Sequence, residues 1–256
     1  MNRIKISPLA AIEPRSSTPE DLKDPELQNV APDPQPVDCF ESLAFGAIDN
    51  LSVFLPMHYE EKYEYPLIVW LHGNDQSADQ IQQIMPSVSM RNYVAVAPAA
   101  PAIDREQNQL WLQDPMVISE AHESVVQAID YATNGFNINP DRIFLAGAGQ
   151  GGTMAFRLAF QRPDLFAGVV SLNGPLPTER SVLGDWTRCR NMPVFWAHCR
   201  DSEDFDQDTL CQQLKLLHVA GFSVTLRQYP GFKMMSDKML SDCNSWVMEH
   251  ISSVIS

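Results

Sequence analysis

The sequence has no long uninterrupted apolar segment, few basic residues and no cluster of positive charge. Its 256 residues carry 18 Lys and Arg against 32 Asp and Glu, which gives a formal net charge of -14. Such a chain has no group of cations with which to neutralise a row of phosphates, so we expect no nucleic-acid partner. The same charge argues against anionic membrane surfaces, and no window approaches the apolar length of a membrane span.

The sequence also lacks paired cysteines. Its five cysteines are scattered, and none forms a C-x-x-C pair. An odd, unpaired set of thiols fits a reducing compartment better than a disulfide framework or a zinc site. Two prolines interrupt the apolar stretch within the first 17 residues, which is not the pattern of a secretory signal peptide. We therefore expect a cytoplasmic protein that holds no metal and no cofactor.

Residues 1–38 are rich in proline and polar side chains, with seven of the 19 prolines of the chain. Such a segment has little apolar area to offset the entropy of chain ordering. It is predicted to be a loosely held arm with at most a short helix near 19–27. Residues 39–256 are long enough to form one domain with a substantial core.

Beyond residue 40, short apolar runs rich in strand-forming residues alternate with segments that carry a helical apolar stripe. Strands are predicted at 51–55, 66–71, 93–97, 142–146, 168–172, 194–197 and 223–229, and helices at 77–84, 118–132, 152–161, 208–219 and 237–251. The first two strands are expected to form a hairpin. A capping box at 77–80 is expected to open the first helix, and Pro86 to end it. The alternation favours a mostly parallel sheet with helices on both faces and a functional site at the carboxyl ends of the strands.

The turn after the strand at 142–146 lacks the residue that its pattern calls for. Residues 147–151 read GAGQG. They align with the frame Gly-x-Ser-x-Gly, which presents a nucleophilic serine on a strand-to-helix turn. Gly149 stands where that serine would be. Because the backbone at such a turn is strained for any residue with a Cβ, glycine at this position is expected to stabilise the fold.

Several other segments, together with this turn, resemble the phospholipase/carboxylesterase and polyhydroxybutyrate-depolymerase-like branch of the α/β-hydrolases. In the order and spacing of that family, they are PLIVWLHG at 66–73, VAP at 96–98, PDRIFLAG at 140–147, QGG at 150–152 and PDLFAGVVSLNG at 163–174. The resemblance covers roughly 51–251 and implies an α/β-hydrolase fold. It also implies acyl transfer by a serine, a histidine and an orienting carboxylate, with two backbone amides that hold the oxyanion.

The resemblance places Ser202 at the position of the orienting carboxylate. That residue usually stands four positions after a strand-end histidine, here His198. Asp201 and Asp204 flank Ser202, so a shifted carboxylate stays open as an alternative.

The resemblance places Met234 at the position of the catalytic histidine, in the turn that follows Tyr229. Counting back from the last helix places Lys233 there instead, and neither residue is an imidazole. With Gly149 at the nucleophile position, all three side-chain roles are unfilled. Three departures together indicate a relaxed need for catalysis.

The backbone N–H groups that bind the oxyanion in this family are expected to remain. The N–H groups of Asn74 and Gln150 stand where the family has its oxyanion donors. A helix N-terminus with free N–H groups favours an anion or a polarised carbonyl. We therefore expect a protein that has lost catalysis and binds either a small ester or carboxylate ligand at these two residues, or a protein partner.

Two alternatives stay open. The chain could be an active carboxylesterase or thioesterase with relocated residues, for example Ser171 or Cys199 with Lys233. The glycines of 147–152 also fit the dinucleotide fingerprint G-x-G-x-x-G, although the strand that follows does not end in the acidic residue which that reading requires.

Three large side chains near the expected site have a structural interpretation. His72 and His198 end strands and are expected to make structural hydrogen bonds rather than to act as bases. Trp111 either lines the pocket, as in the family, or simply packs in the core.

Overall fold

The structure is a computed structural model that describes residues 51–106, 108–177, 186–190 and 192–253. All of these residues belong to one compact unit, Ala44–Ser256. The proline-rich arm at 1–38, its expected helix at 19–27 and the boundary with the domain at 39–256 lie outside the described residues.

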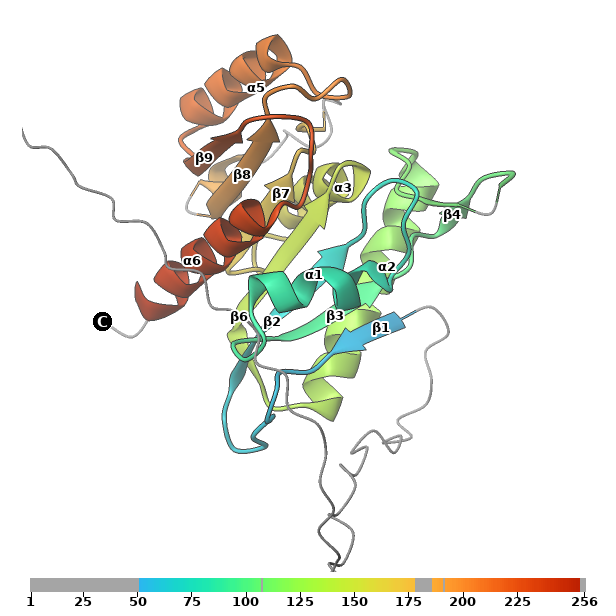
Figure 1. Ribbon diagram of the computed structural model, residues 1–256, viewed down its shortest axis with the longest axis vertical. Coiled ribbons are helices and arrows are strands. Elements are labelled where there is room, and N and C mark those ends of the chain that lie inside the picture. The colour runs from blue at the N-terminus through green and yellow to red at the C-terminus, as the bar shows by residue number, and fades with distance from the viewer. Residues whose placement is uncertain (1–50, 107, 178–185, 191, 254–256) are drawn as a thin grey trace, which may run out of the picture. The chain divides into compact units, whose positions relative to one another are not determined.

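The described residues build a seven-stranded sheet with the order β1-β3-β2-β6-β7-β8-β9 (Figure 1). The strands are β1 Leu51–Phe54, β2 Tyr65–Leu71, β3 Val94–Pro98, β6 Ile138–Ala148, β7 Gly168–Leu172, β8 Pro193–Cys199 and β9 Ser223–Tyr229; β4 Ala102–Ile103 and β5 Gln109–Leu110 form a separate pair. Strand β1 is antiparallel to β3, and the other neighbours in the large sheet are parallel. The predicted mostly parallel sheet is confirmed.

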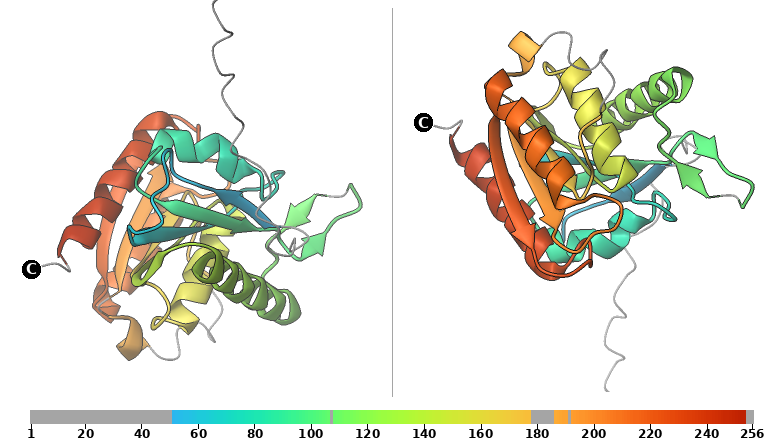
Figure 2. Two further views of the ribbon diagram at one scale, coloured as in Figure 1. Left: turned by 90° about the horizontal axis from the view of Figure 1, so that it is seen from below. Right: turned by 90° about the horizontal axis from the view of Figure 1, so that it is seen from above.

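Helices cover both faces of the sheet, as predicted (Figure 2). Helices α1 Gln80–Val88 and α6 Asp237–Ser253 lie on one face, helices α2 Pro115–Gly135, α3 Gln150–Gln161 and α5 Gln207–Ala220 lie on the other, and the single turn α4 Trp186–Cys189 precedes β8. Side chains alternate between the two faces, so that in β2 Leu67 and Val69 enter one core while Ile68 and Trp70 enter the other. Because both faces are covered, β2 is buried along its whole length.

The expected hairpin of the first two strands is wrong. Strand β1 pairs with β3, with Leu51 opposite Pro98 and Phe54 opposite Ala95. Strand β2 lies between β3 and β6 and is parallel to both. The polar stretch between β1 and β2 is therefore a connection that leads from the edge of the sheet past β3 to its centre.

The expected start and end of the first helix are also wrong. Helix α1 begins at Gln80 and continues through Pro86 to Val88, and its N-cap, Asp79, makes no capping hydrogen bond with its side chain. The Oε1 atom of Gln80 is used elsewhere, because it accepts hydrogen bonds from Trp70 Nε1 at 2.9 Å and from Gly73 N at 3.0 Å. Pro86 stands close to the end of the helix, where its missing N–H removes only one hydrogen bond.

Helix α3 approaches the ends of the central strands so closely that their backbones are in contact. A Cβ atom on Gly151 would overlap the carbonyl oxygens of His72 and Leu71. Only glycine permits this approach, which sets the first turn of α3 directly against the loop that follows β2.

We predict that Gly151→Ala destabilises the protein by about 1 to 3 kcal/mol, because the added methyl group must separate α3 from β2. Urea unfolding measures the free energy of unfolding. Gly135→Ala is the matched control, since a Cβ atom at Gly135 has nothing within 4 Å. The control is expected to leave stability unchanged or slightly increased. Equal unfolding midpoints for both variants would contradict the close contact.

Candidate functional site

The turn from β6 into α3 has the backbone of a nucleophile elbow but carries no side chain. Gly149 has φ 53° and ψ -122° and is the N-cap of α3. A residue with a Cβ atom is strained in such a region by about 1 to 3 kcal/mol. The Gly149 N–H donates to the carbonyl of Leu172 at 2.9 Å, and the Gly149 carbonyl accepts from Thr153 N at 3.1 Å. The turn is thus fixed from both sides, and its glycine offers no atom for attack.

The side chain of Asn74 lies against this turn. Its Oδ1 atom accepts a hydrogen bond from the Gln150 N–H at 3.1 Å. A Cβ atom on Gly149 would stand 3.0 Å from the same oxygen. The structure therefore brings the two predicted oxyanion positions together, with the amide of Gln150 bonded to the carboxamide of Asn74. The Oε1 atom of Gln150 is buried and has no hydrogen-bond partner among the described residues.

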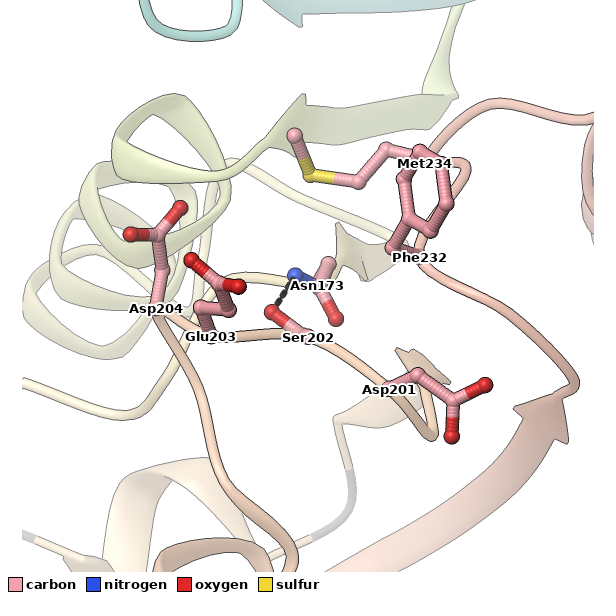
Figure 3. Close-up of a pocket in the computed structure, with 7 residues that line it drawn as sticks. All are labelled: Asn173, Asp201, Ser202, Glu203, Asp204, Phe232 and Met234. Atoms are coloured by element: carbon pink, nitrogen blue, oxygen red, sulfur yellow. Dashed lines mark hydrogen bonds between the residues drawn. The ribbon is translucent and has the colours of Figure 1, made fainter.

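Ser202 and Met234, the positions aligned with the carboxylate and the imidazole, line one pocket of about 400 Å³ at the carboxyl ends of β7 and β8 (Figure 3). The rest of its lining comes from Asn173, Asp201, Glu203, Asp204 and Phe232. The Oγ atom of Ser202 accepts hydrogen bonds from Asn173 Nδ2 at 2.8 Å and from Phe205 N at 3.3 Å. The pocket holds a hydroxyl group and a thioether at the two positions that the sequence resemblance predicts for the carboxylate and the base.

The other candidates for these two roles are placed differently. Asp201 forms an ion pair with Arg200 at 3.2 Å and accepts from Gly231 N at 3.0 Å. Asp204 lines the pocket, and its exposed carboxylate lies on the opposite side from Phe232 (Figure 3). Lys233 is exposed to solvent, whereas its neighbour Met234 lines the pocket.

His72 and Trp111 are structural side chains. The Nε2 atom of His72 accepts from Ala100 N at 3.2 Å, so Nδ1 carries the proton and donates to the Gly73 carbonyl at 3.0 Å. Burial lowers the pKa of His72, which keeps the ring neutral. Trp111 is 1% exposed and donates from Nε1 to the carbonyl of His72 at 3.1 Å. Of the two alternatives for Trp111, core packing is therefore correct.

His198 is also used structurally, as predicted. It is fully buried, and its Nε2 atom donates to the Phe205 carbonyl at 2.9 Å. Its Nδ1 atom accepts from Gln228 Nε2 at 3.4 Å. Both ring nitrogens are thus occupied, one by a bond to the loop after β8 and the other by a bond to strand β9.

Ser171 and Cys199, the two candidates for a relocated nucleophile, are buried in the sheet. Ser171 is fully buried, and its hydroxyl group donates to the Gly174 carbonyl at 3.0 Å. Cys199 is fully buried as well, and burial raises the pKa of its thiol. A protonated, buried thiol is a poor nucleophile. Neither residue lines the pocket that holds Ser202 and Met234.

Asn173 is a site residue that sequence reasoning missed. It has a positive φ of 57°, and its side chain joins two strand ends. Its Oδ1 atom accepts from Cys199 N at 2.9 Å, while its Nδ2 atom donates to Ser202. The available signal is an asparagine directly before Gly174 at the end of a strand, because asparagine tolerates left-handed backbone better than most residues.

Within the described ranges, no group of three His, Cys, Asp or Glu side chains is placed to hold a metal ion. No helix there is long and apolar enough to cross a membrane.

Comparison with known proteins identifies the family. The model of the family described as Phospholipase/Carboxylesterase matches residues 58–251. The chain belongs to this family. The matched range includes the glycines of 147–152, on which the dinucleotide-binding alternative depends.

Carboxylesterase SOBER1 of Arabidopsis thaliana is 24% identical over 206 residues, which cover 72% of this chain and 90% of that protein. Its crystal structure matches 73% of this chain and 99% of its own, with a TM-score of 0.61 and 22% identity. The Bacillus cereus carboxylesterase matches 80% and 96% of the two chains, with a TM-score of 0.64 and 13% identity. The structure of Zea mays acyl-protein thioesterase 2 matches 78% of this chain and 98% of its own, with a TM-score of 0.63 and 16% identity. These likenesses confirm the predicted α/β-hydrolase fold.

The burial of Cys199 leads to a chemical prediction. In the native protein at neutral pH, iodoacetamide is expected to alkylate the exposed Cys211 and to leave Cys199 unmodified until the protein is unfolded. Peptide mass spectrometry over a time course measures both rates in one sample, with Cys211 as the internal control. Alkylation of Cys199 as fast as that of Cys211 would support the alternative in which Cys199 is a relocated nucleophile.

Proposed function

We propose that this chain is a catalytically degenerate member of the phospholipase/carboxylesterase family and functions as a binding protein. Its ligand is a small ester or carboxylate that occupies the former active-site pocket. The observation that carries the proposal is Gly149, which stands at an elbow with φ 53° and ψ -122° and has no group that can attack a carbonyl. Acyl transfer by this family's mechanism begins with such a group.

The surroundings of the elbow support the same proposal. Acyl transfer needs a base that takes up a proton, and the thioether of Met234 is not a base at neutral pH. It also needs a carboxylate that orients the base, and the hydroxyl group of Ser202 carries no charge. Amide donors alone leave a rate of about 10³ to 10⁴ over water in a protease without its triad, which is a trace of enzymatic activity.

The alternative, an active carboxylesterase or thioesterase with relocated residues, has less support. The hydroxyl group of Ser171 is bonded to a backbone carbonyl, and the thiol of Cys199 is buried with a raised pKa. Neither residue lines the pocket, and Lys233 is exposed to solvent. A nucleophile must lie close to its base and to the oxyanion donors for the reaction to proceed.

The pocket has the size of a small-ligand site. Its volume of about 400 Å³ lies within the range of sites that hold small molecules. Phe232 is 79% exposed at its edge, and this apolar ring favours a protein partner as the second candidate occupant.

We also propose a cytoplasmic location, since the four cysteines at positions 189, 199, 211 and 243 are free thiols.

The first test uses the unmodified protein. It is expected to show no stoichiometric labelling by a fluorophosphonate probe and no turnover of short-chain p-nitrophenyl esters above the background. Intact-mass spectrometry and absorbance follow the two reactions, with carboxylesterase SOBER1 as the positive control. Stoichiometric labelling, or turnover that one substitution abolishes, would refute the proposal.

A second test restores the missing groups. Gly149→Ser alone is expected to remain unlabelled, because Met234 stands at the position that the resemblance gives to the base. Adding Met234→His and Ser202→Asp in the same chain is expected to increase the labelling rate. Both positions line one pocket with Asn173, and Asn173 directly follows Leu172, whose carbonyl accepts from the Gly149 N–H. Rapid labelling of the single variant would show that another base is within reach of residue 149.

A further inference from the structure

The side-chain carboxamide of Asn74 resembles the ester or carboxylate group that the elbow would bind. Its Oδ1 atom is a carbonyl oxygen and accepts from the Gln150 N–H at 3.1 Å. An ester or carboxylate oxygen at an oxyanion site accepts from the same kind of backbone donor. We propose that Asn74 is an internal occupant of the oxyanion position, so that the site is closed until a ligand displaces this side chain. The proposal rests on the proposed function and concerns the regulation of that same site.

Gly149 and Asn74 depend on each other. A Cβ atom at position 149 would stand 3.0 Å from Oδ1 and 3.7 Å from Cγ of Asn74, and the first distance is too short for an unstrained contact. Any side chain at the nucleophile position would therefore meet the carboxamide. The glycine removes the nucleophile and at the same time makes room for the asparagine.

Asn74 is placed to act as a displaceable group rather than as part of the core. The backbone before it is held, because Gly73 N donates to the buried side chain of Gln80 at 3.0 Å. The side chain of Asn74 is itself exposed to solvent, and Asp75 turns the chain away with φ 55°. Rotation of an exposed side chain can uncover the Gln150 N–H without movement of the sheet or of α3.

The exchange also predicts which ligands open the site. A neutral ester replaces one neutral hydrogen bond by another and gains little. A carboxylate forms a charge-assisted hydrogen bond with the same N–H, and such bonds are stronger. The N-terminus of α3 adds a favourable interaction with negative charge. A carboxylate is therefore expected to displace the Asn74 side chain more readily than a neutral ester.

The test measures butyrate binding by isothermal titration calorimetry for the unmodified protein, Asn74→Gly and Gln76→Ala. Asn74→Gly is expected to bind butyrate about 2- to 13-fold more tightly, which corresponds to one hydrogen bond that no longer has to be broken. Gln76→Ala, exposed on the same loop, is the matched control and is expected to bind like the unmodified protein. Equal affinity for the unmodified protein and Asn74→Gly would overturn the proposal.

A double-mutant cycle measured by unfolding tests the contact between Asn74 and residue 149 without any ligand. Gly149→Ala is introduced into the unmodified protein and into Asn74→Gly, and urea unfolding is measured for all four proteins. Backbone strain at residue 149 is common to both backgrounds and cancels. Gly149→Ala is expected to raise the unfolding equilibrium constant in both backgrounds. The factor by which it does so is expected to be smaller in the Asn74→Gly background, by about 3-fold or more. Equal shifts would overturn the internal occupant, whereas a difference without any butyrate binding would keep it and refute only the proposed carboxylate ligand.

Discussion

The contact between the first turn of α3 and the ends of the central strands is the constraint on which the site depends. Gly151 lies against the carbonyls of Leu71 and His72, so a side chain at this position would push α3 away from the strand ends. The same contact brings together the Gly149 turn, the loop after β2 and the end of β7. The architecture of an elbow is thus required by packing, and it persists whether or not a nucleophile stands on it.

The residues at and beside the positions that the resemblance gives to the catalytic groups form hydrogen bonds and contacts of their own. Ser202 is bonded to Asn173, and Asn74 is bonded to the amide of Gln150. Met234 packs against the apolar core on the face that α1 and α6 cover. Because a buried polar group without a partner is costly, the bond between the buried Asn173 and Ser202 stabilises this end of the sheet. The proposed loss of catalysis is therefore compatible with retention of the fold.

Much of the fold could be predicted, because runs such as 168–172 and 223–229 have the composition of strands and form strands with those bounds. Motif spacing also led to Ser202 and Met234, which line one pocket. The pairing of β1 with β3 could not be predicted, since it is decided by contacts across the sheet. The direction of the Asn74 side chain depends on α3, which lies 76 positions further along the chain, and no local pattern encodes it.

The account depends most directly on the hydrogen bond between Asn74 and the elbow amide. Scalar coupling across hydrogen bonds, measured by nuclear magnetic resonance, detects such a bond. A coupling is predicted between the Gln150 amide nitrogen and the Asn74 Cγ atom. The bond from Cys199 N to Asn173 Oδ1, at 2.9 Å, joins the same chemical groups and serves as the reference. A coupling at Cys199 with none at Gln150 would contradict the account, because the elbow would then have an open amide.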